Sequence, residues 1–347
     1  MDRRAAGWPT AGSPNSVTAI RLLLASAVLL SHSWPVTQGS NVNEPVFALT
    51  HGQLTIAHLA VNAFFILSGY LVAESWFRSR SAGQYLAKRA LRIYPGWLAC
   101  VLVMFLIIVP IFGRVSLGAI PFLPAIAGAL VLLPPELQGV FPHAARSGTL
   151  NASLWTIEYE FACYLALALL LTVTRRRPGL GLMLAASGSL LAQVIITVGH
   201  GWFPPAEFAA CFFGGSLFYR YRDRIPQHRL VAITSVALLA GSSLLPGRWS
   251  LALAPVFMIY PLLLLASLRA GSRLRVDYSY GVYLYAFPIQ QVVGTLVPNL
   301  QPLPLAVVAF PITLLIAALS WHVVEEPCLR LKRGLRQPPR MVQRAAA

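Results

Sequence analysis

The chain has 347 residues, of which 57% are hydrophobic and only 11% charged, and its formal net charge is +16. Soluble globular proteins carry roughly 25% charged residues, so this composition excludes an ordinary soluble domain and indicates a multi-pass membrane protein. A basic face on a soluble domain would indicate a nucleic-acid partner. Here the basic residues lie between apolar segments, so no nucleic-acid partner is expected.

Apolar segments long enough to cross a bilayer recur along the whole chain. They cover residues 17–36, 53–77, 90–112, 152–174, 180–199, 203–220, 229–246, 250–268, 278–298 and 303–324. The sequence therefore predicts an all-α polytopic membrane protein with about ten transmembrane helices. A further apolar stretch, residues 119–133, is short and contains Pro121 and Pro124.

The basic residues decide how the stretch at 119–133 is interpreted. If it does not cross the membrane, all but three of the 27 basic residues fall on one side, the exceptions being Arg114, Arg146 and Arg248. Cytoplasmic loops carry the excess of Lys and Arg in membrane proteins. We therefore expect 119–133 to be a re-entrant or interfacial segment and both termini to be cytoplasmic.

Three regions are expected on this basis. Residues 1–16 form a cytoplasmic N-terminal segment, which leads into a signal anchor and not a cleaved signal peptide. Residues 17–326 form the membrane domain, and residues 327–347 form a basic cytoplasmic tail. The four cysteines have no paired spacing, so neither a disulfide framework nor a metal site is expected.

The first apolar segment opens on Arg21 and carries His32 eleven residues later. Eleven residues are almost three helical turns, so both side chains lie on one helix face, separated by roughly 16 Å of rise. A polar group inside a membrane usually faces a cavity or a partner and serves a substrate or proton pathway. We expect Arg21 and His32 to serve the same cavity.

Two acids, Glu158 and Glu160, begin a span that enters from the outer side, which is the side His32 approaches. A neutral imidazole can take a proton from a hydroxyl, and a carboxylate can hold its tautomer. We therefore predict that Glu158 supports His32, with Glu160 as the weaker candidate. The structural alternative is that both acids simply suit a helix N-terminus near water.

Two arginines, Arg89 and Arg92, lie three residues apart on one helix face at the inner surface. Guanidinium groups suit phosphate oxygens, although such a pair can also bind anionic lipid head groups. His58 is interpreted as structural, and Ser68-Gly69 as a place where helices approach closely.

Six short motifs appear in the order found in the acyltransferase-3 family, which the chain resembles from about residue 15 to 330. They are Arg21 with His32, Asn62-Ala-Phe-Phe-Ile-Leu-Ser-Gly-Tyr70, Arg89-x-x-Arg92-Ile-Tyr-Pro95, Leu154-Trp-Thr-Ile-Glu158, Tyr278-Ser-Tyr-Gly-Val-Tyr-Leu-Tyr285 with Pro288, and Glu326-Pro327. The family consists of integral membrane O-acyltransferases that modify bacterial surface polysaccharides and related glycans. The chain resembles the stand-alone form, without the extra C-terminal SGNH-type hydrolase-like domain that some members carry.

The resemblance implies a reaction and its residues. An acyl-CoA donor, usually acetyl-CoA, is presented from the cytoplasm of a bacterial inner membrane, and the acceptor is a hydroxyl of a cell-surface or lipid-linked glycan. His32 matches the essential histidine, Arg21 its partner arginine, and Glu158 the glutamate of its motif, so these are the expected catalytic residues. Arg89 and Arg92 match the pair implicated in donor binding.

Two positions depart from the family pattern. Asn62 stands where many members have an acid, and Ala286 stands where many have a histidine. A charge at the first position is therefore not required here, and a second histidine base in the 278–298 span is not expected.

Several alternatives stay open at this point. Direct transfer to the hydroxyl and a covalent acyl-histidine relay both fit the residues. The main alternative function is a proton-coupled secondary transporter or flippase for a sugar-type substrate, although no inverted repeat supports it. The acceptor, the acyl chain and homo-oligomerisation are left open, and no metal is expected.

Overall fold

The computed structural model describes residues 7–9, 16–113, 122–135, 137, 139–142, 144–146, 148–199, 201–268 and 276–334. Within these ranges the regular secondary structure is helical, apart from one isolated β-bridge between Gly113 and Val140, and turns and loops connect the helices. The predicted all-α fold is confirmed for this part of the chain.

Most helices follow one another with short connections, and the longest connection runs from Leu130, at the end of α6, to Trp155, at the start of α7. They are α1 (Val17–Gln38), α2 (Pro45–Leu49), α3 (Ile56–Phe77), α4 (Ala82–Val103), η1 (Met104–Ile108), α5 (Val109–Phe112), α6 (Phe122–Leu130), α7 (Trp155–Val173), α8 (Pro178–Val198), α9 (Pro204–Tyr221), η3 (Arg222–Arg224), α10 (Arg229–Ser242), α11 (Trp249–Phe257), α12 (Ile259–Ser267), α13 (Ser279–Leu296), α14 (Pro302–Ser320), η4 (Trp321–Glu325) and α15 (Glu326–Gly334). Helix starts follow local chemistry: the side chains of Thr55 and Ser81 accept hydrogen bonds from the first turns of α3 and α4.

All ten predicted apolar segments contain a helix, and seven helical stretches among the described residues are long and apolar enough to cross a membrane. The other three segments correspond to α9, α10 and α13. Helix α10 has only 14 residues, whereas α9 and α13 carry buried polar side chains such as Glu207 and Gln290. Short length in α10 and buried polar side chains in α9 and α13 therefore accompany the weaker membrane signal of these three segments.

The stretch predicted to be re-entrant or interfacial contains α6, which has nine residues. Nine residues rise about 14 Å, less than half of the roughly 30 Å hydrocarbon core. The part of this stretch before Phe122 lies outside the described residues.

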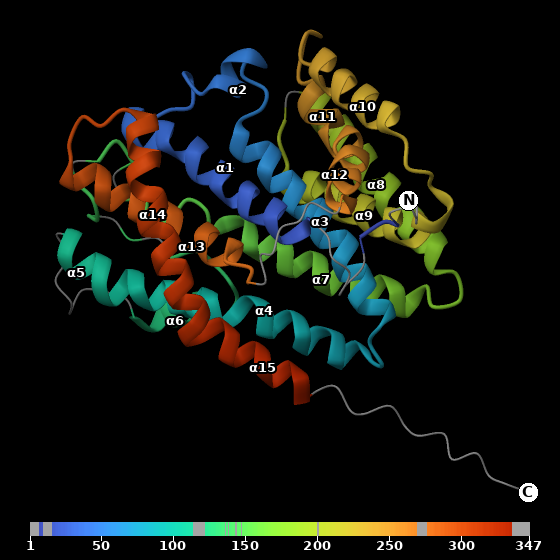
Figure 1. The fold of residues 1–347 in the computed structure, drawn as a ribbon, viewed down its shortest axis with the longest axis horizontal. Helices are drawn as coiled ribbons and strands as arrows, with labels where there is room; N and C mark the ends of the chain where they lie inside the picture. The colour runs from blue at the N-terminus through green and yellow to red at the C-terminus, as the bar shows by residue number, and fades with distance from the viewer. Residues whose placement is uncertain are drawn as a thin grey trace, which may run out of the picture.

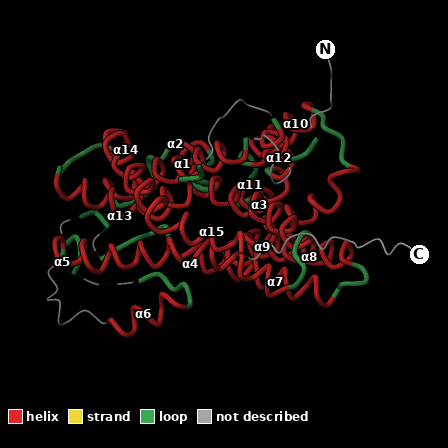
Figure 2. The backbone as a smooth tube through the Cα atoms, turned by 60° about the horizontal axis from the view of Figure 1, so that its bottom comes forward, coloured by secondary structure: helices red, strands yellow, loops and turns green. Residues whose placement is uncertain are grey.

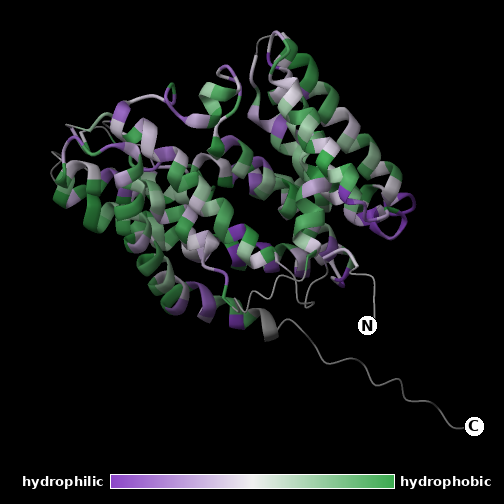
Figure 3. Ribbon diagram, turned by 45° about the horizontal axis from the view of Figure 1, so that its top comes forward, coloured by the Kyte–Doolittle hydropathy of each residue, from purple (hydrophilic) through white to green (hydrophobic). Residues whose placement is uncertain are grey.

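Helices α1 and α3 cross the middle of the molecule, as Figures 1 and 2 show. Helices α13 and α14 pack on one side of α1, and α9 packs on α3 and connects it to α8. Helix α4 runs beside α15 on a further face, next to α7. Figure 3 shows hydrophobic residues along most helices and hydrophilic residues mainly in the connections, as expected for a protein surrounded by lipid.

The closest helix contact joins α3 and α9. A Cβ added to Gly69 would overlap the backbone oxygen of Phe212, and one added to Gly215 would overlap the backbone oxygen of Ile66. The Ser216 hydroxyl donates a hydrogen bond to the backbone oxygen of Gly69 over 3.0 Å. Small residues allow such close packing in membranes, so the prediction made from Ser68-Gly69 is confirmed.

The N-terminal segment packs beside the η3 turn. The Trp8 indole donates a hydrogen bond to the backbone oxygen of Ile225 over 2.9 Å, and the Tyr70 hydroxyl donates to the backbone oxygen of Pro9 over 2.8 Å. The segment before α1 and the basic 220–229 loop therefore lie on the same side. Arg3, Arg4 and residues 269–275, which the topology argument also used, lie outside the described residues.

The predicted boundary at residue 326 lies within a continuous helical stretch. Helix α14 continues through η4 into α15, which ends at Gly334, so the helical part extends past residue 326. An amphipathic turn that contains Arg330 continues the helix because Glu326 and Arg330 form an i,i+4 ion pair of 3.0 Å. The rest of the predicted tail, from residue 335, lies outside the described residues. The four cysteines are all unpaired, as predicted.

Candidate active site

A cavity of about 330 Å³ opens beside the C-terminal half of α1, the half that the predicted topology places toward the outer side. Its walls come from α1, α2, α3, α7, α9, α11 and α13 and from the segments that precede α3 and α9. The lining residues that matter below are His32, His58, Trp155, Thr156, Trp202 and Tyr283. We refer to this space as the outer cavity.

His32 is half-buried in the wall of the outer cavity. Its Nδ1 lies 3.4 Å from the Ser153 hydroxyl, and its ring packs edge-on against Phe287, with 5.5 Å between the ring centroids. Ser153 is itself positioned, because its backbone N–H donates to Asn151 over 3.0 Å and the Asn151 amide donates to the backbone oxygen of Leu284 over 2.8 Å. The other ring nitrogen of His32, Nε2, is therefore the one that can exchange a proton with a substrate.

Glu158 does not line the outer cavity, although it lies in the first turn of α7 together with Trp155 and Thr156, which do. Among the described residues, the hydrogen-bond partner of His32 is Ser153 and not Glu158. The predicted pairing of Glu158 with His32 is therefore absent from this arrangement, because the turn before α7 brings Ser153 to the histidine first.

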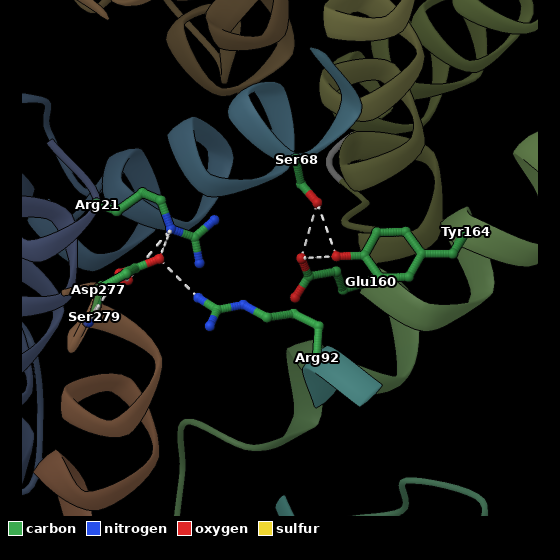
Figure 4. Close-up of polar contacts among 7 residues, drawn as sticks. All are labelled: Arg21, Ser68, Arg92, Glu160, Tyr164, Asp277 and Ser279. Carbon is green, nitrogen blue, oxygen red and sulfur yellow. Dashed lines mark hydrogen bonds and ion pairs between the residues drawn. The ribbon is translucent and has the colours of Figure 1, made fainter. Parts of the chain in front are cut away.

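The carboxylate of α7 that does enter the interior is Glu160. It accepts hydrogen bonds from the Ser68 hydroxyl, over 2.9 Å, and from the Tyr164 hydroxyl (Figure 4). It lines a second, smaller pocket of about 40 Å³ together with Arg21, and we call this the inner pocket. The sequence reasoning ranked Glu160 below Glu158, and the structure reverses their positions relative to the interior.

Arg21 and Arg92 meet at one carboxylate, that of Asp277. Arg21 Nε lies 3.1 Å and Arg92 Nη2 lies 2.7 Å from Asp277 Oδ2 (Figure 4). The hydroxyl of Ser279 donates to the other oxygen of Asp277. Burial alone would raise the pKa of Asp277, but the charges of Arg21 and Arg92 and the hydrogen bonds from Ser279 hold that pKa at about 2.

Arg21 therefore lies with Arg92 and not beside His32. The sequence predicted that Arg21 and His32 lie on one helix face and serve the same cavity. In the structure they line two different spaces: Arg21 lines the inner pocket and His32 lines the outer cavity. Asp277 was not singled out from the sequence. An acid directly before an apolar span and beside a cluster of arginines is the signal that could have identified it.

Arg89 separates from Arg92 although the two are neighbours on α4. It donates to the Ser75 hydroxyl over 3.3 Å, and its guanidinium lies 5.9 Å from the centroid of the Tyr164 ring. Its Nε is buried and has no hydrogen-bond partner among the described residues. Arg89 thus contacts Ser75 and Tyr164, whereas Arg92 contacts Asp277.

The two spaces adjoin each other. Val61, Thr156 and Tyr283 line both the outer cavity and the inner pocket. A hydrogen bond of 2.6 Å joins the hydroxyls of Thr156 and Tyr283. One line of polar groups therefore runs from Asp277 through the inner pocket to His32, and the Thr156–Tyr283 contact is its narrow point.

A short lid covers the outer cavity. The helix α2 and the turn after it contribute Phe47 and Gln53 to the lining. The lid is fixed by Glu44, a fully buried carboxylate that accepts hydrogen bonds from the Ser31 hydroxyl and from the backbone N–H groups of Phe47 and Ile56, over 3.1, 2.7 and 2.6 Å.

A second histidine, His58, lines the outer cavity, and its Nε2 lies 2.7 Å from the carboxylate of Glu207. The sequence reasoning interpreted His58 as structural and missed Glu207. The available signal was an acid in the first turn of an otherwise apolar segment.

Comparison with known proteins identifies the family. A family model described as an acyltransferase domain matches residues 15–322, which is nearly the whole chain. The chain belongs to the acyltransferase-3 family. It is thus a member of a family of membrane O-acyltransferases, as the motifs predicted.

Named relatives of this acyltransferase family member cover most of its length. An O-acetyl transferase of Shigella phage Sf6 is 29% identical over 90% of this chain and 95% of the relative. Nodulation protein 10 of Rhizobium leguminosarum bv. viciae is 26% identical over 94% of this chain and 96% of the relative. Acyltransferase MdmB of Streptomyces mycarofaciens is 27% identical over 56% of this chain and 49% of the relative. No solved structure matches the chain.

Proposed function

We propose that this acyltransferase moves an acyl group, most simply acetyl, from cytoplasmic acyl-CoA to a hydroxyl of a cell-surface or lipid-linked glycan. The observation that carries the proposal is the continuity of the site: the arginine cluster at Asp277 and the cavity of His32 are joined through shared lining residues. A donor with a phosphate-rich head and a long acyl arm, and an acceptor that enters from the opposite side, suit such an arrangement.

The donor end is assigned to Arg92, Arg89 and Arg21. Guanidinium groups bind phosphate oxygens through paired N–H donors. Asp277 supplies one negative charge against the two positive charges of Arg21 and Arg92, so these three side chains together carry one positive charge, while Glu160 lines the inner pocket with Arg21. Arg89 supplies a third guanidinium from the same helix as Arg92. A CoA phosphate would bind here by hydrogen bonds that Asp277 leaves unused.

The acyl arm would extend from this cluster toward His32, over roughly half of the bilayer core. The inner pocket measures only about 40 Å³, so the arm passes only when the side chains of Thr156 and Tyr283 separate. Charge on the CoA head stays at the inner side, while the thioester reaches the outer cavity.

At the outer cavity His32 acts as general base. It takes the proton from the acceptor hydroxyl as the oxygen attacks the thioester carbonyl carbon, and a C–O bond forms. The C–S bond then breaks, and the CoA thiolate leaves with the proton that His32 returns. Ser153 holds the imidazole at Nδ1, so Nε2 is the nitrogen that faces the reaction.

The protein would reside in a bacterial inner membrane with both termini cytoplasmic. Two features support this topology: 24 of the 27 basic residues fall on one side if residues 119–133 do not cross the membrane, and Trp8 packs beside the basic loop after α9.

The test uses the purified protein in lipid nanodiscs with radiolabelled acetyl-CoA and a bacterial extract of lipid-linked saccharides. Wild type is expected to move label into the saccharide fraction, and His32→Ala is expected to abolish this transfer while binding of CoA persists. If label stays on CoA with acetyl, propionyl and longer donors, the proposal fails, and uptake of saccharide into vesicles that contain the protein would then support a transporter.

A further inference from the structure

The wall of the outer cavity formed by α3 and α9 contains a group of side chains that the reaction above does not use. Glu207, at the first turn of α9, is fully buried and accepts three hydrogen bonds. His58 and Asn62 lie 2.7 Å from its Oε1, and the Trp202 indole N–H donates to its Oε2 over 2.8 Å.

A buried carboxylate in a membrane protein is costly, and it is usually kept where it serves a site. Two of the three partners of Glu207 are not fully buried with it, whereas Asn62 is. Trp202 is 46% exposed and the His58 side chain is 20% exposed, and both line the outer cavity. The carboxylate thus fixes two groups that face open space, which a purely structural cluster would not require.

The hydrogen bond to Glu207 also determines which ring nitrogen of His58 is available to a ligand. With Nε2 engaged by the carboxylate, the remaining ring nitrogen is Nδ1, which has no hydrogen-bond partner among the described residues. In the neutral imidazole that donates Nε2–H to Glu207, Nδ1 accepts a hydrogen bond, and in the charged imidazolium paired with the carboxylate Nδ1–H donates one; in either form Nδ1 can bind a hydroxyl.

Aromatic rings continue this wall. Trp202 meets Trp155 edge to face, with 5.8 Å between centroids, and Trp155 lies 5.6 Å from Phe208. All three rings line the outer cavity. Flat apolar rings beside a hydroxyl-binding group form a surface that fits a ring with one apolar face and a polar edge.

We propose that His58 and Trp202 form the acceptor-binding wall of the outer cavity and that Glu207 is the residue that positions both. His58 hydrogen-bonds a hydroxyl of the acceptor, Trp202 packs against the acceptor ring, and the attacked hydroxyl is thereby turned toward His32. The proposal rests on the proposed function, since it names the residues that select the acceptor in the same site. Asn62, which stands at the acid position of the family pattern, takes part by donating to Glu207.

The experiment measures transfer of radiolabelled acetyl in nanodiscs at varied amounts of the lipid-linked saccharide extract, and separately at varied acetyl-CoA. The variants are His58→Gln, Glu207→Gln, Trp202→Ala and Trp202→Phe. Phe203→Ala is the matched control, because Phe203 is the exposed neighbour of Trp202 and does not line the cavity. Elution as a single species and the thermal midpoint check that each variant folds.

The half-saturating amount of extract is expected to rise about tenfold for His58→Gln, Glu207→Gln and Trp202→Ala, the size of one lost contact of about 1.4 kcal/mol. Trp202→Phe, which keeps a ring, is expected to lose clearly less, and Phe203→Ala is expected to match wild type. Half-saturating acetyl-CoA should stay within about twofold throughout, because the donor end is unchanged.

The proposal is overturned if the His58 and Trp202 variants leave the dependence on extract unchanged, or if acceptor and donor dependence shift equally. If Glu207→Gln does not fold, the His58 and Trp202 variants decide. These outcomes differ from failure of the proposed function, in which wild type itself transfers no label.

Discussion

Arg21 and Arg92 come from different helices and bind the same oxygen of one carboxylate, Oδ2 of Asp277. Both arginines therefore depend on the same carboxylate for their ion pair. A phosphate that enters this cluster meets two guanidinium groups already held side by side, which lowers the cost of ordering them on binding.

Removal of the Asp277 charge should therefore destabilise the protein. Asp277→Asn leaves two partly buried arginines without their carboxylate, and we expect a loss of about 2 kcal/mol in the free energy of unfolding. Thermal unfolding in detergent would measure it. Asp223→Asn is the control, because Asp223 is highly exposed in its pair with Arg222 and should change stability by less than about 1 kcal/mol. An equal effect of the two changes would contradict the prediction.

The low pKa of Asp277 also predicts a pH dependence of stability. The pKa is lowered from 3.8 to about 2 in the folded protein, so the folded state favours the ionised carboxylate. The resulting stability is fully present above pH 3.8 and is lost as the pH falls through about 2. Between these values, unfolding midpoints of wild type should fall more steeply with acid than those of Asp277→Asn. Parallel curves would show that Asp277 does not contribute.

The partner of His32 can be identified by comparing three variants. Because Ser153 is the group at Nδ1, Ser153→Ala should lower kcat by about tenfold, and His32→Ala by about 10² to 10⁴-fold. Glu158→Gln tests the pairing predicted from the sequence. If it lowers kcat more than Ser153→Ala does, the carboxylate reaches His32 during the reaction even though it does not line the cavity in this structure.

The narrow point between the two spaces should limit the acyl arm. Tyr283→Trp places a larger ring beside Thr156, and we expect kcat to fall about tenfold or more while the affinity for CoA stays the same. Tyr283→Phe keeps the size of the ring and should retain most activity. Loss of CoA affinity in the tryptophan variant would show that Tyr283 acts on the donor end instead.

The lid over the outer cavity depends on Glu44. Glu44→Ala removes the acceptor of three hydrogen bonds from a fully buried position, and we expect a loss of about 2 to 3 kcal/mol of stability. Proteolysis within the loop before α3 should accelerate in this variant. Glu74→Gln, at the opposite end of α3, is a comparison that should leave cleavage of this loop unchanged.

Much of the fold could be predicted from the sequence because bilayer thickness and positive charge act on every segment independently. Hydropathy alone found a helix in each of the ten segments. It could not show that α9 and α13 carry polar groups into the interior, because contacts between helices distant in the chain decide which polar residues find partners.

The candidate site could be predicted only in part, because contacts between helices that are distant in the chain cannot be predicted from one segment at a time. Helical spacing placed Arg21 and His32 on one face of α1. Spacing alone could not show that the face is divided between the outer cavity and the inner pocket. Asp277 and Glu207 were missed, because their importance comes from arginines and a histidine that other helices supply. Glu158 and Glu160 were ranked by motif, whereas the rotation of α7 decides which of them points inward.

The contact between α3 and α9 at Gly69 and Gly215 has a consequence for distant mutations. His58 lies eleven residues from Gly69 along α3, and Glu207 lies eight residues from Gly215 along α9. Helices α3 and α9 pack along their length, from Gly69 and Gly215 to the hydrogen bond between Asn62 and Glu207. A methyl group added at Gly69 or Gly215 would push the helices apart, and the displacement would reach His58, roughly 16 Å from Gly69 along α3, and alter the choice of acceptor. Natural variants with altered acceptor selectivity are therefore expected at the Gly69–Gly215 contact as well as in the outer cavity.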